Sequence, residues 1–86
     1  MKTVFSRRFK KQYKKLSVKI RAKFDLRLQL FLAESWNHEL NLHKLSGVYE
    51  GLWSINITGD IRAIFDRDLK DAIIFVAIGT HPELYG

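Results

Sequence analysis

The sequence predicts an α+β domain in which two helices pack on one face of a small antiparallel sheet. Three features indicate this: an apolar, β-branched run over 72–78, two shorter strand-like segments before it, and helical spacing of apolar residues in the first third. Strands joined by short turns pair as a meander, and helices grouped in the sequence pack on one face of the sheet. With 86 residues, we expect a single domain, 1–86.

The apolar run Ala72–Ile78 is predicted as the central strand. Seven apolar residues between Asp71 and Gly79 are typical of a strand buried on both faces. A buried helix is the alternative, but seven residues are short for one. A strand that ends at a glycine delivers the following residues to the edge of the sheet, where His81 stands. The tail Pro82–Gly86 has room for one helical turn.

The N-terminal third is predicted as a short strand followed by a helical hairpin. Residues 2–5 have the β-branched and aromatic content of a strand. Ser6 and Ser17 are suited to cap two helices that run to near Leu16 and to about Glu34. The expected apolar faces are Phe9, Tyr13 and Leu16 on the first helix and Ile20, Phe24, Leu28 and Phe31 on the second, widened by Leu26, Leu30 and Leu32.

The middle of the chain supplies the other strands of the meander. Residues 35–42 are polar and mixed and are predicted to be a connector. Leu52–Ile57 alternates with period two, which favours a strand with Trp53, Ile55 and Ile57 on one face. The turn Thr58–Asp60 leads to a strand over Ile61–Phe65, and the charged segment Asp66–Asp71 is predicted as a hairpin loop.

The basic residues are concentrated at one end of the chain. Residues 1–24 contain ten Lys or Arg and no acidic residue, whereas the remaining residues carry a net charge of −4. This asymmetry suits a polyanion such as a phosphate backbone, or an acidic protein partner. The alternative is a helical face that is merely solvated.

Several protein classes are disfavoured by composition. The chain has no cysteine, so disulfides and thiolate metal sites are excluded. No apolar run approaches the roughly 18 residues of a membrane span. The first residues lack the apolar core of a signal peptide, so we expect a cytoplasmic protein with no membrane partner. Three aspartates, Asp66, Asp68 and Asp71, are expected to form a solvated turn, and no metal site is predicted.

Asp60, Arg62 and His81 are the candidate chemical residues. In an antiparallel pair the start of one strand lies beside the end of the next, so these residues are expected to converge. Taken singly, each has an ordinary alternative: a turn residue, a surface ion-pair partner and a solvated terminal histidine. Together they suit RNA cleavage, which needs a proton acceptor, a proton donor and a cation for the phosphate. His43 is a second candidate histidine.

Four segments of the chain resemble a known family. They are His-Lys-Leu-Ser-Gly (43–47), Gly-Leu-Trp-Ser (51–54), Gly-Asp-Ile-Arg-Ala-Ile-Phe (59–65) and Ile-Gly-Thr-His-Pro-Glu-Leu-Tyr (78–85). With the opening Phe-Ser-Arg-Arg-Phe-Lys-Lys (5–11), they resemble the YafQ branch of the RelE-type toxins of bacterial type II toxin–antitoxin systems. The resemblance covers nearly the whole chain, and its most specific part is the Gly-Thr-His-x-x-Leu-Tyr ending.

The resemblance implies a RelE-like fold and a ribosome-dependent endoribonuclease, called an mRNA interferase. Such enzymes act without metal or cofactor, by attack of the 2′-OH on the adjacent phosphate, and inhibit translation. The resemblance also implies an antitoxin partner and a toxin–antitoxin complex that binds operator DNA through the antitoxin. From the charge asymmetry we expect the antitoxin to bring an acidic, partly helical segment that covers the basic hairpin or the open face of the sheet.

The resemblance carries over to particular residues. His81 matches the family's C-terminal catalytic histidine, Asp60 its acidic turn residue, His43 a histidine ahead of a Leu-x-Gly turn and Arg62 a strand arginine. The basic hairpin is expected to contact ribosomal RNA through Arg7, Arg8, Lys10, Lys11, Lys14 and Lys15. The chain departs from the family at Asn56, Ile61, Phe65 and Ala77, which replace histidine, tryptophan, tyrosine and arginine and predict weakened activity.

Two alternatives share this fold. One is an inhibitor of DNA gyrase like the ParE branch, in which a terminal histidine and a Gly-Asp turn are not expected to matter. The other is a non-catalytic relative that retains only RNA or antitoxin binding.

Overall fold

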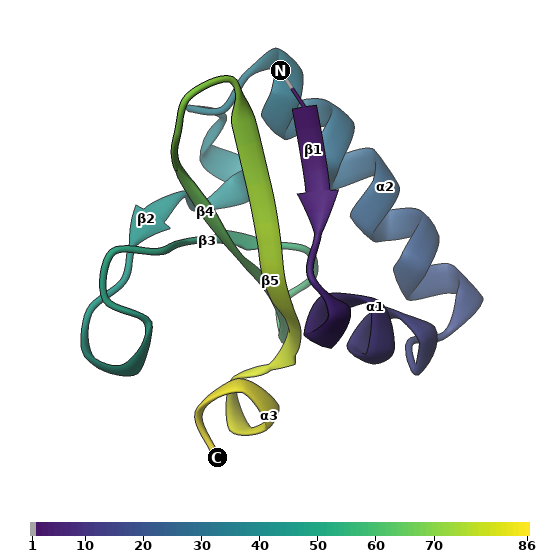
Figure 1. Ribbon diagram of the computed structural model, residues 1–86. Coiled ribbons are helices and arrows are strands. Elements are labelled where there is room, and N and C mark those ends of the chain that lie inside the picture. The colour runs from purple at the N-terminus through teal and green to yellow at the C-terminus, as the bar shows by residue number, and fades with distance from the viewer. Residues whose placement is uncertain (1) are drawn as a thin grey trace.

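The computed structural model describes residues 2–86 and shows a five-stranded sheet with a helical hairpin on one face (Figure 1). The strands, in the spatial order β1-β5-β4-β3-β2, are β1 (Lys2–Phe5), β2 (His43–Lys44), β3 (Trp53–Asn56), β4 (Ile61–Leu69) and β5 (Ala72–Thr80). The helices are α1 (Arg7–Lys14), α2 (Val18–Ala33) and α3 (His81–Tyr85), with 3₁₀ turns η1 (His38–Leu40) and η2 (Gly47–Tyr49). The predicted α+β class and its element order are confirmed.

Strand β5 lies inside the sheet, between β1 and β4. It pairs in parallel with β1, from Lys2 opposite Ala72 to Phe5 opposite Phe75. It pairs antiparallel with β4, and β3 and β2 extend the sheet further. The chain therefore closes on itself, because its first strand joins its last.

Beyond the end of β1, helix α1 and its N-cap take the place of that strand beside β5. The Ser6 amide donates to the Phe75 carbonyl (2.9 Å), and the Ser6 hydroxyl donates to the carbonyl of Val76 (3.0 Å). Ser6 also caps α1, as predicted, by accepting from the Phe9 amide (3.1 Å). Six residues after Ser6, the side chain of Gln12 in α1 accepts from the Ile78 amide (2.9 Å). These contacts satisfy β5 where its strand neighbour has ended.

A β-bulge in β5 changes the face of the sheet on which the side chains of its C-terminal half lie. Phe75 and Ala77 pair with consecutive residues of β4, so β5 carries one extra residue, Val76. The extra residue shifts the alternation of side chains by one position. Phe75 and Ile78 consequently both join the core under the hairpin, whereas Ala77 faces the opposite side. The prediction that the run is buried on both faces is correct only at its end, where Ala77 and Ile78 are both buried. It is wrong at Ala72, Ile74 and Val76, which are only partly buried.

The main core lies between the sheet and the hairpin and is rich in aromatic rings. Phe24 meets Phe75 edge-on at a centroid distance of 5.4 Å, and Phe5 stacks on Phe9 at 5.1 Å. Tyr13 packs beside Phe9 at 5.8 Å. The predicted apolar faces of both helices are thus confirmed at their centres.

The prediction that Leu26 and Leu32 widen the buried face of α2 is wrong. Their side chains are 63% and 51% exposed, although Leu30 packs against the core. A helix on a small sheet buries one stripe, and both leucines lie well around the helix from the buried positions Phe24 and Phe31.

The predicted hairpin loop over 66–71 is shorter than expected. Strand β4 continues to Leu69, and the chain reverses at a turn where Asp71 has a φ of 58°. The guanidinium of Arg67 lies 5.1 Å from the ring centroid of Trp53, which anchors this charged stretch to the sheet. An aromatic contact across strands therefore outweighs the polarity of the segment.

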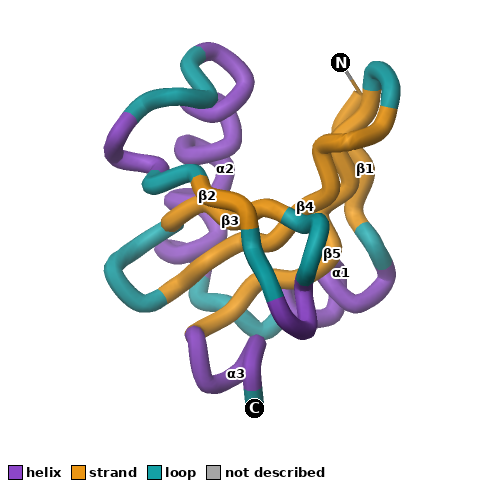
Figure 2. The backbone as a smooth tube through the Cα atoms, turned by 90° about the vertical axis from the view of Figure 1, so that its left-hand side faces the viewer, coloured by secondary structure: helices purple, strands orange, loops and turns teal. Residues whose placement is uncertain are grey.

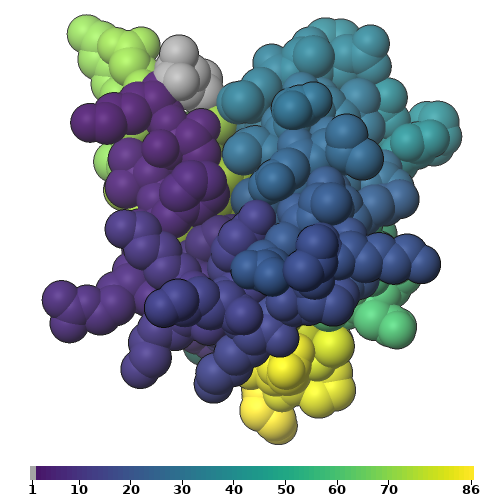
Figure 3. Space-filling model, turned by 90° about the vertical axis from the view of Figure 1, so that its right-hand side faces the viewer, coloured from purple at the N-terminus to yellow at the C-terminus, as the bar shows by residue number. Residues whose placement is uncertain are grey.

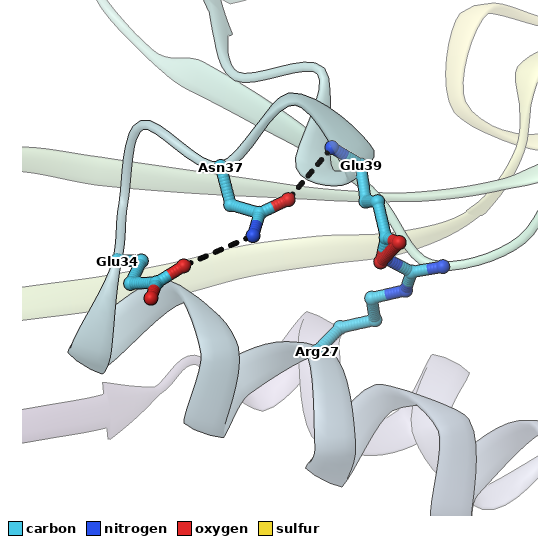
Figure 4. A network of polar contacts seen from close by, with 4 residues as sticks. All are labelled: Arg27, Glu34, Asn37 and Glu39. Atoms are coloured by element: carbon cyan, nitrogen blue, oxygen red, sulfur yellow. Dashed lines mark hydrogen bonds and ion pairs between the residues drawn. The ribbon is translucent and has the colours of Figure 1, made fainter.

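The connector after α2 is ordered by polar contacts (Figure 4). Asn37 caps η1 by accepting from the Glu39 amide (2.9 Å), and its side-chain amide donates to Glu34 (3.0 Å). Arg27 reaches back from α2 to the carboxylate of Glu39 at 3.3 Å. The predicted irregular connector therefore contains a short 3₁₀ turn, and these contacts hold that turn against α2.

A smaller apolar cluster covers part of the face opposite the hairpin. It consists of Tyr49, Ile64, Ala77 and Leu84, with Leu45, Leu52 and Val76 packed against it. The loop with η2 and the C-terminal helix α3 lie at the same end of the sheet in both views (Figures 1 and 2). No helix within residues 2–86 is long and apolar enough to cross a membrane.

We predict that Phe75→Ala lowers the free energy of unfolding by about 3–5 kcal/mol, because it leaves a cavity in the aromatic core. Urea unfolding followed by circular dichroism measures this. Leu26→Ala, at an exposed site, is the control and should change it by no more than about 0.5 kcal/mol. Equal losses in the two variants would contradict the assignment of the core.

Candidate functional site

Asp60 and His81 lie together at one end of the sheet. Ile61 pairs with Thr80, so Asp60 and His81 are the next residues beyond the paired ends of β4 and β5. Both side chains are exposed. The antiparallel register therefore places both residues at the same end of the sheet.

Arg62 lies one step further along β4, on the face opposite the helical hairpin. It pairs with Asn56 of β3 on one side and with Gly79 of β5 on the other. Its Nη1 donates to the Asn56 side-chain oxygen at 2.9 Å. This bond directs the guanidinium over β3 and leaves other N–H donors available for a phosphate.

Asn56 stands where the resembled family can carry a histidine, and in this chain its side chain contacts Arg62. The sequence predicts a loss at this position, because an amide cannot transfer protons as histidine does. In the structure the amide oxygen instead restrains Arg62. Sequence reasoning missed this pair, although both residues are polar and lie in neighbouring strands.

His43 lies on the same face of the sheet but further away. It pairs with Ser54, so two strand spacings and two residues along the strand separate it from Arg62, which is roughly 12 Å. Its Nδ1 is 2.8 Å from the carbonyl oxygen of Asn41. A carbonyl only accepts, so Nδ1 carries a proton and Nε2 is free to accept one in the neutral ring. The structure does not bring His43 into contact with the other candidates.

His81 begins the short helix α3. Thr80 is its N-cap, and Thr80 and Glu83 form a reciprocal capping box. The His81 ring stacks on Tyr85, with 4.5 Å between centroids and 27° between planes. The predicted tail is therefore a defined helix, and the spacing Thr-x-x-Glu is the sequence signal that indicates it.

The capping box also affects the pKa of Glu83. Its carboxylate accepts from the Thr80 backbone amide at 2.8 Å, and the Glu83 backbone amide donates to the Thr80 hydroxyl oxygen at 3.3 Å. Hydrogen bonding to Thr80, chiefly to its backbone amide, lowers the pKa of Glu83. A β-carbon on Gly79 would lie 3.0 Å from the carboxylate, so the glycine allows this close approach.

The cations of α1 project on two sides of the helix. All six predicted RNA contacts are exposed. Four of them, Arg7, Lys10, Lys11 and Lys14, line a groove of about 540 Å³ beside α1 (Figure 3). One acidic residue, Asp25, also lines it and accepts from the Tyr13 hydroxyl at 3.3 Å, and its apolar walls are Phe5, Phe9, Tyr13, Phe24 and Leu28. The other two face α3: Arg8 bonds to Tyr49, and Lys15 lines a hollow of about 180 Å³ with Glu83.

The fold is that of small RelE-type toxins. YafQ from E. coli strain BL21(DE3) superposes with a TM-score of 0.80 and 20% identity over 98% of this chain and 97% of that one. YafQ in the E. coli DinJ–YafQ toxin–antitoxin complex gives 0.78 and 21% over 98% and 96%. The RelB–RelE antitoxin–toxin complex from Methanococcus jannaschii gives 0.72 and 24% over 95% and 94%.

Comparison of the sequence with family models shows which family within this class the chain matches. Residues 1–86 match the model described as bacterial toxin of type II toxin-antitoxin system, YafQ. The chain belongs to the YafQ toxin family, as the resemblance in its motifs predicts. None of the curated proteins matches it.

We predict that acidification loosens α3 through Glu83. Because the pKa of Glu83 is lower in the folded state, its contribution to stability is present above the ordinary value of 4.5 and is lost as the pH falls through the folded-state pKa. The Thr80 amide resonance, followed by NMR during titration, reports this loss. Glu83→Gln keeps an acceptor but does not titrate, so an identical pH response in that variant would contradict the prediction.

Proposed function

We propose that the chain is a cytoplasmic toxin that cleaves mRNA on the ribosome. The observation that supports this most is the placement of His81, Asp60 and Arg62 at one exposed end of the sheet, in a member of the YafQ family. An acid–base histidine, a carboxylate and a phosphate-binding arginine are the groups that cleavage by 2′-OH attack requires.

The proposed reaction needs only proton transfer and charge stabilisation. The 2′-oxygen loses its proton to a base and attacks the adjacent phosphorus, while the bond to the 5′-oxygen breaks and that oxygen takes a proton from an acid. The products are a 2′,3′-cyclic phosphate and a 5′-hydroxyl end. His81 is the principal acid or base, assisted by Asp60; His43, which lies two strands from Arg62, is not assigned a proton transfer. Arg62, restrained by Asn56, stabilises the negative charge on the phosphate.

The basic hairpin provides the proposed docking surface for ribosomal RNA. Its α1 cations are exposed, and within residues 2–86 the only ion pair is between Arg27 and Glu39, on α2 and the connector. The charges of α1 therefore remain available for phosphates.

We also propose that an antitoxin inhibits the chain through an acidic segment. The solved relatives include toxin–antitoxin complexes, DinJ–YafQ and RelB–RelE. The groove beside α1 has apolar walls and is lined by four cations and a single carboxylate, that of Asp25, so its net positive charge fits an amphipathic segment with acidic residues on its polar side.

Primer extension on an mRNA in a reconstituted translation reaction tests the proposed function. We predict cuts within codons that require ribosomes, and a loss of at least about 10²-fold in His81→Ala, because the principal proton-transfer group is gone. Circular dichroism checks that the variant is folded. Intact mRNA with translation still blocked would indicate a binding inhibitor of the ribosome. Intact mRNA with translation unaffected would indicate a gyrase inhibitor or an inactive relative.

The antitoxin proposal has a separate test. We predict that Lys10→Glu with Lys14→Glu weakens binding of the purified antitoxin by at least about tenfold, because both charges lie on the groove rim. Lys2→Glu with Lys70→Glu, two exposed sites at the β4–β5 turn, changes the net charge equally and is the control for charge alone. Isothermal titration calorimetry measures the affinities, and equal weakening in both variants would contradict a docking site in this groove.

A further inference from the structure

The helix that carries His81 is held in place by a tyrosine from a distant part of the chain. Tyr49, at the end of η2, is only 6% exposed. Its hydroxyl donates to the backbone carbonyl of Leu84 at 2.6 Å. Its ring meets that of Tyr85 at right angles, with 5.2 Å between centroids. Tyr49 therefore contacts both of the last two residues of α3.

This anchoring matters because α3 has little stability of its own. It has five residues and lies at the C-terminal end of the described chain. The last carbonyl groups of any helix lack partners within the helix, and an isolated single turn is unstable in water. The Tyr49 hydroxyl satisfies one of these carbonyls, that of Leu84, in a buried position.

Arg8 of α1 also binds the Tyr49 hydroxyl. Its Nη2 donates to the Tyr49 hydroxyl oxygen at 3.0 Å, and its guanidinium carbon lies 5.8 Å from the centroid of the Tyr49 ring. A hydroxyl has one hydrogen to donate, here given to Leu84, and lone pairs that accept from Arg8. A charged donor on the oxygen polarises the O–H bond and strengthens its donation.

The contacts continue from Tyr49 to His81. The Tyr85 ring, packed against Tyr49, stacks on the His81 imidazole at 4.5 Å. An unbroken series of contacts therefore runs from α1 through η2 to the His81 ring: Arg8, Tyr49, Tyr85, His81. The residues joined by these contacts are far apart in the sequence: Arg8 and Tyr49 are 41 positions apart, and Tyr49 and its hydrogen-bond partner Leu84 are 35 apart.

We propose that Tyr49 and Arg8 are positioning residues for His81. They fix the place of α3 and, through Tyr85, the plane of the imidazole. This rests on the proposed function in one respect, the role of His81 as acid or base. Arg8 then differs from the other α1 cations, because its guanidinium acts within the protein as well as toward RNA. Such positioning affects rate strongly, since a displacement of about 1 Å costs on the order of 10² in rate.

The test uses Tyr49→Phe, which keeps the ring and removes the hydroxyl. The stacked Tyr85 ring shifts the NMR signals of the His81 ring protons upfield. In Tyr49→Phe we expect this upfield shift to shrink and ribosome-dependent cleavage to fall by about tenfold or more. Signals of His81 at their wild-type positions in Tyr49→Phe would overturn the proposal, whatever happens to cleavage.

Arg8→Gln and Arg7→Gln form a matched pair for the arginine. Both remove one positive charge from adjacent positions of α1, so both weaken binding to RNA electrostatically. Only Arg8→Gln is expected to move the His81 ring signals, because only Arg8 contacts Tyr49. Equal movement in both variants, or movement in neither, would overturn the role of Arg8.

The two proposals fail in distinguishable ways. If the His81 signals move in Tyr49→Phe and Arg8→Gln while the wild-type protein cuts no mRNA, the positioning of His81 is supported and the proposed reaction is wrong. If the wild-type protein cuts mRNA but the signals do not move, the reaction is supported and the positioning role is wrong.

Discussion

The parallel pairing of β1 with β5 is the constraint on which the rest of this structure depends. It places Phe5 beside Phe75 and so creates the aromatic core that α1 and α2 cover. It also fixes the start of α1, because Ser6 bonds to β5 and caps the helix at the same time. Because the two strands are about 70 residues apart, this contact closes the chain and makes its N-terminal and C-terminal segments neighbours.

That closure links the basic hairpin to the candidate site. Gln12 ties α1 to β5 at Ile78, close to the start of α3. One side of α1 therefore faces α3, and the other side lines the groove toward α2. A single short helix thus contributes to core packing, to a basic rim suited to an acidic partner, and to the support of His81 through Arg8.

Much of the fold could be predicted because it depends on local patterns. Ser6 and Ser17 cap the helices as expected, and the run over 72–78 forms the strand between β1 and β4. The errors arose where local polarity was a poor guide. Residues 66–69 of the charged segment continue β4, where Arg67 packs on an aromatic ring, and Leu26 is exposed because the small sheet has no surface left to cover it.

The sequence alone determined the order of the main elements, the charge asymmetry, the family motifs and the end of the sheet at which Asp60 and His81 lie. These follow from short-range spacing and antiparallel register. The tertiary structure alone decided three things: the bulge at Val76, the restraint of Arg62 by Asn56, and the anchoring of α3 by Tyr49. The physical reason is that bulges and side-chain hydrogen bonds between separate elements depend on three-dimensional packing, which no local pattern of residue types encodes.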